Sequence, residues 1–288
     1  MTSTDQRQHP VTGQDTAGGL FRRTVRVRTT PRAAGSPTPA PARPRTAVAT
    51  VVHHEHEALL GQVDGLSVST WPPDVHVVAS VSDRELTRNR LPIRSDRWET
   101  RVPRMQMPRT PCGWQHRAML MAMDEAATAD VEVLVFLDVR SIPATGLLEA
   151  YAELAGPAAD GPPTVLEAAV LDLLPPGPLG YPVSRELAAW TATRQDGADD
   201  PAPLVCPASF AVSARHWEQV RTAWTQLRQD GSAQATVTDA VLALGGVRVL
   251  APGTGVYLQH HDATTARYLH GRGDQLVDEG SSTQSMPA

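Results

Sequence analysis

The chain has 288 residues, 41% of them hydrophobic, which suffices for a substantial core in one large domain or two small ones. All 26 basic residues are arginines, and the absence of lysine excludes reactions that need a Schiff-base lysine, a pyridoxal-phosphate anchor or a Walker-type lysine. The net charge is −5, and the two cysteines, Cys112 and Cys206, are too far apart in sequence for a CxxC pair, which excludes a thiolate zinc site.

The terminal segments differ in composition from the body of the chain. Residues 1–45 contain eight Arg, two Asp and a PTPAPARPR stretch, and we expect a disordered tail, with binding to a polyanion as the alternative. Residues 272–288 are expected to form a second disordered tail, which leaves one folded domain over 46–271. The domain is acidic, so no nucleic-acid partner is expected. No apolar run approaches the ~18 residues of a membrane span and no secretion signal is present, which predicts a cytoplasmic protein without a transmembrane segment.

Hydrophobic periodicity predicts alternating strands and helices in the body of the chain. In order, we expect a strand over 47–52, a helix over 58–66, a strand over 75–81, a short strand near 101–105, a helix over 113–129, a strand over 131–139, a helix over 145–155, strands over 165–174 and 210–212, helices over 215–229 and 236–244, and strands over 247–250 and 255–258. Residues 175–203 are rich in Pro, Gly and Asp and predict a long loop. This alternation favours an α/β fold with parallel strands.

The stretch VEVLVFLDVRSIP, residues 131–143, predicts a strand buried on both faces that ends on Asp138. In open α/β sheets, ligands bind at the carboxyl ends of the strands. Asp138 is suited to hold a divalent cation against a diphosphate. Arg140 lies on the same side of an extended chain and could neutralise the phosphates directly. The alternative is that Asp138 is the N-cap of a helix that starts near Pro143.

Four stretches follow one another in the order of a known family. They are TAVATVVHHEHEALLGQVDGL, PPDVHVVASVSD, VEVLVFLDVRSIPATGLLEAY, and the region from CPASFAVSARHW to VYLQHH. Together they resemble a family 2 glycosyltransferase of the GT-A fold, with a part that is similar to galactosyltransferase C-terminal domains. The resemblance implies a three-layer α/β/α domain with a mostly parallel central sheet. It also implies transfer of a sugar from a nucleotide-sugar donor to an acceptor hydroxyl with inversion, and the sequence does not identify the acceptor.

The resemblance also implies roles for individual residues. It assigns the donor to the loop after the first strand and to later strand ends, through His53, His54, Glu57, Asp83 and Asp138, to which the chemistry of the strand end adds Arg140. It makes Asp138 and His261 the ligands of a divalent cation, Mn or Mg. The acids nearest to the stretch that matches the family's base are Asp230 and Asp239, and Asp239 is taken as the general base. The alternatives are a solvated loop for the HHEHE run, a surface position for Asp239 and a structural role for His260 and His261.

Two departures from the family pattern bear on activity. The second acid of the usual Asp-x-Asp motif is replaced by Arg140, which weakens or abolishes the metal site. The helix that usually opens with Glu-Asp is matched by GSAQATVT, residues 231–238, which contains no acid. The rival interpretation is therefore a catalytically inactive GT-A-like protein that binds a nucleotide or a partner. Either interpretation requires His53, Asp83 and Asp138 to lie at one edge of the sheet.

Overall fold

The structure is a computed structural model of the chain, and its describable part begins at the first predicted strand. It describes residues 43–88, 91–108, 113–155, 161–175, 181, 184–191, 208–232 and 234–259. The predicted tails, apart from residues 43–45, lie outside this part. Cys112, Cys206, His260 and His261 also lie outside it.

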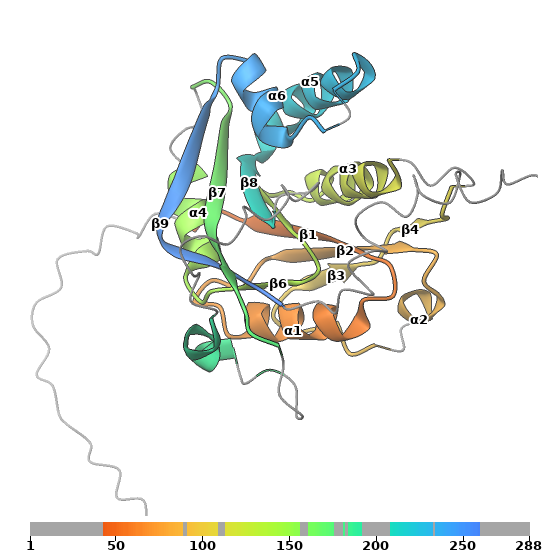
Figure 1. Cartoon of the computed structure of the whole chain (residues 1–288), viewed down its shortest axis with the longest axis vertical. Coiled ribbons are helices and arrows are strands. Elements are labelled where there is room, and N and C mark those ends of the chain that lie inside the picture. The colour runs from red at the N-terminus through yellow and green to blue at the C-terminus, as the bar shows by residue number, and fades with distance from the viewer. Residues whose placement is uncertain are drawn as a thin grey trace, which may run out of the picture. The chain divides into compact units, whose positions relative to one another are not determined.

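A single mixed sheet forms the centre of the domain (Figure 1). Its strands are β1 (Thr46–Val52), β2 (Val75–Val81), β3 (Glu99–Arg101), β4 (Arg104–Met105), β5 (Val133–Leu137), β6 (Ser141–Pro143), β7 (Thr164–Asp172), β8 (Ser209–Ser213) and β9 (Val247–Leu258). They lie in the order β3-β2-β1-β5-β8-β7-β9-β6, and β4 pairs with β2. Only the β5–β8, β7–β8 and β6–β9 pairs of these described strands are antiparallel.

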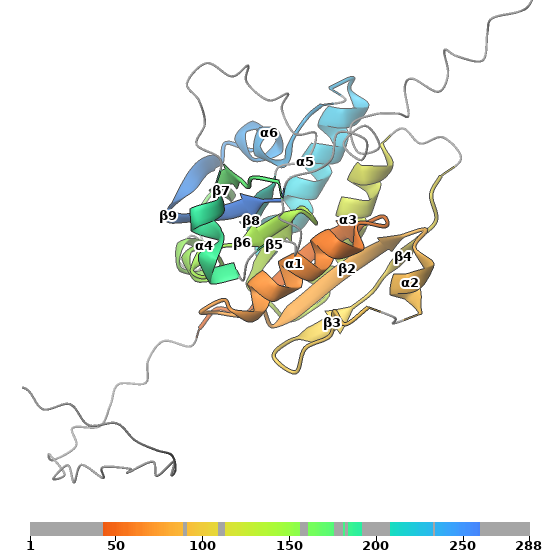
Figure 2. The ribbon, with the colours of Figure 1, turned by 60° about the horizontal axis from the view of Figure 1, so that its bottom comes forward.

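Helices cover both faces of the sheet (Figure 2). They are α1 (His56–Ser67), α2 (Arg84–Thr87), α3 (Trp114–Ala127), α4 (Leu147–Ala155), α5 (Trp217–Gln229) and α6 (Val237–Ala243), with 3-10 helices η2 (Ser184–Trp190) and η3 (Ala214–His216). Val48 of β1 packs in a cluster with residues of α1 and α4, and its neighbour Ala49 packs with residues of α3, α5 and α6. Burial on both faces explains the continuous apolar run of β1. The predicted three-layer α/β/α class with a mostly parallel sheet is confirmed.

The carboxyl ends of β1, β2 and β5 lie at the same edge of the sheet. In the parallel register, Val52 lies opposite Ser80 of β2, and Ala49 lies opposite Phe136 of β5. The loops that carry His53, Asp83 and Asp138 therefore leave the sheet side by side, as the sequence predicted. Gln62 of α1 joins two of these strands, because its Oε1 accepts from the Thr50 hydroxyl at 2.8 Å and its Nε2 donates to the Asp138 carbonyl at 2.7 Å.

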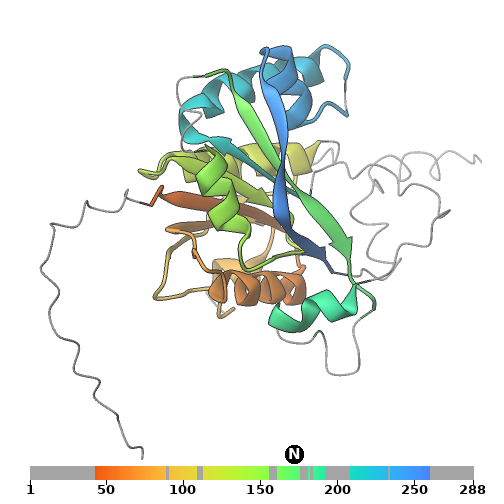
Figure 3. The ribbon, with the colours of Figure 1, turned by 90° about the vertical axis from the view of Figure 1, so that its left-hand side faces the viewer.

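Several short elements differ from the prediction. The chain turns after β5 and residues 141–143 form β6, so Asp138 does not cap a helix, and α4 begins only at Leu147. The two late strands expected over 247–250 and 255–258 are one strand, β9, which runs beside β7 (green in Figure 3). The single strand expected near 101–105 is two, β3 and β4. The helices α2 and η2 were not predicted.

A close approach between α1 and β6 predicts a stability defect. A Cβ added at Gly65 would lie 2.6 Å from Ile142 Cγ2 and 3.0 Å from Pro143 Cδ. We expect Gly65→Ala to lower the free energy of unfolding by about 1–3 kcal/mol, because such overpacking displaces a packed strand. Gly61→Ala on the same helix is the control, since its Cβ meets only the Gln259 side chain, at 3.2 Å. Urea unfolding of both variants measures the difference, and equal stabilities would contradict the prediction.

Candidate functional site

The loop after β2 is organised around the buried carboxylate of Asp83. Its Oδ1 accepts hydrogen bonds from the backbone N–H groups of Glu85 at 3.0 Å and Leu86 at 3.2 Å, so Asp83 is the N-cap of α2. Its Oδ2 accepts from the backbone N–H of His54 at 3.2 Å, which joins this loop to the loop after β1. The Asp83 side chain has no exposed surface. Asp83 therefore holds the loop after β1 and the start of α2 in fixed positions from inside the protein.

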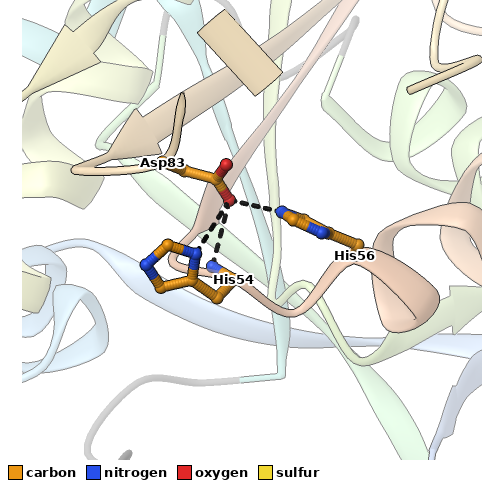
Figure 4. A group of neighbouring side chains, drawn as sticks. All are labelled: His54, His56 and Asp83. Carbon is orange, nitrogen blue, oxygen red and sulfur yellow. Dashed lines mark hydrogen bonds and ion pairs between the residues drawn. The ribbon is translucent and has the colours of Figure 1, made fainter. Parts of the chain in front are cut away.

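Two imidazoles converge on Asp83 Oδ2 (Figure 4). His56 Nε2 lies 2.6 Å from it and His54 Nδ1 lies 3.7 Å from it. Burial raises the pKa of Asp83, but the hydrogen bonds from His56 and from the backbone amides of α2 outweigh burial, so the pKa lies below its usual value. Asp83 is therefore a carboxylate at neutral pH. The side chains of His54 and His56 are 60% and 22% exposed, so the cluster opens to solvent through His54.

The backbone at this point adopts sparsely populated conformations. His54 has φ +70° and Ser82 has φ +51°, and they are the only non-glycine residues with positive φ in the described ranges. Left-handed backbone at residues other than Gly, Asn or Asp costs free energy and concentrates at functional sites. His54 follows β1 and Ser82 precedes Asp83 at the end of β2, so the backbone strain lies next to the contacts between the histidines and Asp83.

Aromatic rings form a continuous surface beside this cluster. The His53 ring centroid lies 4.6 Å from that of His54 and 5.5 Å from that of Trp114, the first residue of α3. His53 is held in place because its Nδ1 lies 2.8 Å from the Val81 carbonyl oxygen. The exposed His54 ring is thus the outer member of a packed aromatic group.

Glu55 connects the β1 loop electrostatically with the end of β5. Its Oε2 accepts a hydrogen bond from the His53 backbone N–H at 2.6 Å. Burial raises the pKa of Glu55, and the negative charge of Asp138 raises it further, against the lowering effect of the His53 amide. A second acid therefore lies close enough to Asp138 for the two charges to interact at this edge.

Asp138 and Arg140 form an ion pair with each other. Asp138 Oδ1 accepts from the Arg140 backbone N–H at 3.0 Å and from its Nε at 3.1 Å. A turn closed by the Ser141 N–H and the Asp138 carbonyl brings the two side chains to the same side, where an extended chain was expected. The Arg140 side chain is only 9% exposed. Asp138 therefore fits a divalent cation poorly, because a cation on its carboxylate would lie beside the buried Arg140 guanidinium and be repelled by it.

The other predicted site residues lie as follows. Glu57 is exposed in the first turn of α1. Asp239 is exposed at the third position of α6, and its Oδ2 accepts from the Thr236 N–H and hydroxyl, both at 2.8 Å, in a capping box. His261 lies outside the described residues. The catalytic role of Asp239 and the metal role of His261 stay predictions.

His56, Glu85 and Trp114 were missed as individual site residues. The signal for His56 was present, because an HxH spacing in a loop that faces an acid at the next strand end is a common ligand pattern. Within the described residues, His54, His56 and Asp83 are the group of side chains whose ligand atoms, all within 4.8 Å of one another, could hold a metal ion.

Comparison with known proteins yields similarity of structure alone. No family model matches the chain, and no curated protein sequence matches it. Residues 1–349 of TarS from S. aureus superpose with a TM-score of 0.47 at 12% identity, over 75% of this chain and 60% of that chain. The same fragment in complex with UDP-GlcNAc superposes with a TM-score of 0.45 at 13% identity, over 76% of this chain and 59% of that chain. The 4-diphosphocytidyl-2C-methyl-D-erythritol synthase from Anaerococcus prevotii superposes with a TM-score of 0.40 at 10% identity, over 73% of this chain and 88% of that chain.

The chain spans about three fifths of the length of the TarS fragment. None of the described helices is long and apolar enough to cross a membrane.

Proposed function

We propose that the chain is a glycosyltransferase that binds a nucleotide-sugar donor at the edge formed by β1, β2 and β5. The observation that carries the proposal is the convergence of three neighbouring parallel strand ends, which bring His54, Asp83 and the Asp138–Arg140 pair to one edge. Ligands of open α/β sheets bind at this position.

The aromatic group supports binding of the base. A nucleobase can stack on the exposed face of His54, which is backed by His53, and such stacking is worth about 1–3 kcal/mol per base. Asp83 is buried, so in this proposal it acts as a positioning residue that holds the His54 backbone rather than as a direct contact to the base.

Arg140 supports the diphosphate part of the reaction. In an inverting transfer the acceptor oxygen attacks the anomeric carbon, the bond from that carbon to the diphosphate oxygen breaks, and a base takes the acceptor proton. A fixed cation stabilises the charge that develops on the departing diphosphate. In this proposal Arg140, at the strand end, supplies that charge without a metal ion, and Asp239 is the sequence candidate for the base.

A second candidate function is nucleotide or partner binding without sugar transfer. Two observations favour it: the Asp239 carboxylate is used in the capping box, and the Asp138 carboxylate is paired with Arg140. In both cases the carboxylate is already engaged by a neighbouring group and is not free to accept a proton from an acceptor. The two functions share the donor site and differ in turnover.

Titration of the full chain with UDP-sugars, with and without Mn²⁺, tests the proposal. We expect binding that does not require Mn²⁺, followed by metal-independent hydrolysis or transfer. His54→Ala should weaken binding about tenfold or more, because it removes the stacking face. Arg221→Ala on α5, whose side chain pairs with Asp124 and Glu218, is the control and should bind normally. Binding without turnover would favour the second candidate, and no nucleotide binding would exclude both.

A further inference from the structure

We propose that His54 Nδ1, His56 Nε2 and Asp83 Oδ2 form a three-ligand site for a borderline divalent transition-metal cation of the zinc class. The site differs from the Asp138 and His261 pair expected from the sequence. It does not depend on nucleotide binding, so a metal titration without nucleotide tests it alone.

The distances between the ligand atoms suit such an ion. Bonds of about 2.0–2.2 Å to nitrogen and oxygen in a tetrahedral arrangement separate ligand atoms by about 3.3 Å. His56 Nε2 and His54 Nδ1 lie 2.6 and 3.7 Å from Asp83 Oδ2, on either side of this value. Binding therefore requires the first separation to grow by about 0.7 Å and the second to shrink by about 0.4 Å. The two histidine nitrogens, which lie within 4.8 Å of each other, must also reach about 3.3 Å, and the proton of the His56–Asp83 hydrogen bond passes to solvent.

The surrounding groups orient each ligand. The second nitrogen of His56, Nδ1, lies 3.4 Å from Glu85 Oε2, the arrangement in which a carboxylate holds a metal-binding imidazole in the correct tautomer. Two backbone amides of α2 hold Asp83 Oδ1, which leaves Oδ2 directed at the histidines. The His54 ring also turns its Nδ1 toward the same oxygen (Figure 4). The cluster thus has supporting contacts in addition to its three ligands.

The ligand types determine the class of metal. Two imidazoles and one carboxylate suit zinc, cobalt, nickel or iron(II), whereas magnesium and calcium prefer sites made of oxygen ligands alone. Three protein ligands leave at least one coordination position open, as in catalytic zinc sites. The exposed side of the cluster is at His54, so the open position is accessible to water or to an anionic ligand.

Calorimetric titration of the metal-free full chain, without a histidine tag, with Zn²⁺ and Co²⁺ tests the proposal. We expect one strong site, with a Co²⁺ absorption spectrum that indicates nitrogen ligands, and no competition from Mg²⁺. His54→Asn should abolish this site, and Asn is chosen because it tolerates a left-handed backbone. His56→Gln should have the same effect. Glu85→Gln should weaken binding about tenfold, the lower end of the effect of removing an outer carboxylate.

Control variants separate this site from the other histidines of the chain. His216→Asn on η3 and the double variant His260→Asn with His261→Asn should bind Zn²⁺ like the parent chain. Circular dichroism of the metal-free variants shows whether they are folded, and if His54→Asn is not, His56→Gln and Glu85→Gln carry the test. Unchanged Zn²⁺ affinity in the folded ligand variants, loss of binding in the His260 and His261 double variant, or equal affinity for Mg²⁺ would each overturn the proposal.

Discussion

Replacement of His76 by leucine is expected to stabilise the protein most strongly at acidic pH. His76 is the second residue of β2 and has no exposed surface, and neither ring nitrogen has a hydrogen-bond partner among the described residues. Its ring packs edge-on against Trp98, with the centroids 6.3 Å apart. An unpaired buried polar group costs about 1–3 kcal/mol, so an apolar side chain of similar size should be better tolerated even at neutral pH.

The pH dependence follows from the protonation of the imidazole. Burial lowers the pKa of His76 from 6.5 to about 4. The unfolded chain therefore binds a proton as the pH falls below about 6.5, while the folded chain binds it only near pH 4. The stability of the folded chain with neutral His76 is therefore fully present above pH 6.5, and it falls as the pH drops from 6.5 to about 4. The total loss is about 3 kcal/mol, since one pKa unit corresponds to about 1.4 kcal/mol.

Urea unfolding between pH 4 and pH 7 measures this effect. The parent chain should lose stability over that range, and His76→Leu should remove this contribution. His76→Gln is the matched control, because it removes the titration but keeps an unpaired polar group in the core. We expect His76→Gln to share the flatter pH profile without the gain at pH 7. Parallel pH profiles for the parent and the leucine variant would contradict the prediction.

The sequence predicted the part of the fold that depends on long apolar runs. Every residue of β2 is buried, as is every residue of β5, so their periodicity was unambiguous, and the parallel order of β1 and β2 followed from the helix between them. The short strand β6 could not be predicted, because SIP pairs with Leu258 and its neighbours, which lie more than a hundred residues later. Pairing of this kind has no local signal.

The candidate site was predictable in position but not in its pairings. The spacing of Asp138 and Arg140 indicated that they lie on one side, yet their mutual ion pair depends on a turn fixed by contacts to Gln62 and Ala208. The capping box of Thr236 and Asp239 was readable as a Thr-x-x-acid pattern before a helix. The His54, His56 and Asp83 cluster required the short helix α2, because its amides orient the carboxylate.

Replacement of Arg140 by methionine should destabilise the protein and increase its response to Mn²⁺. Methionine keeps most of the apolar stem but leaves Asp138 unpaired near Glu55, whose pKa is raised mainly by burial and further by the charge of Asp138. Removal of one partner of a buried pair costs about 3–5 kcal/mol. Asp138 is 21% exposed, so water stabilises its unpaired charge in part, and we expect a loss of about 2 kcal/mol, below that range.

A double-mutant cycle with Asp138→Asn isolates the interaction. Each single variant leaves a charge without its partner, whereas the double variant leaves none, so we expect a coupling free energy of about 1–3 kcal/mol. Thermal unfolding of the four proteins with and without Mn²⁺ adds the functional part. If Arg140 takes the place of a metal ion at Asp138, Mn²⁺ should raise the Tm of Arg140→Met and leave that of the parent unchanged. Equal shifts in both would mean that the guanidinium does not compete with a cation for this carboxylate, and Arg140 would then have no claim to the role of the missing metal.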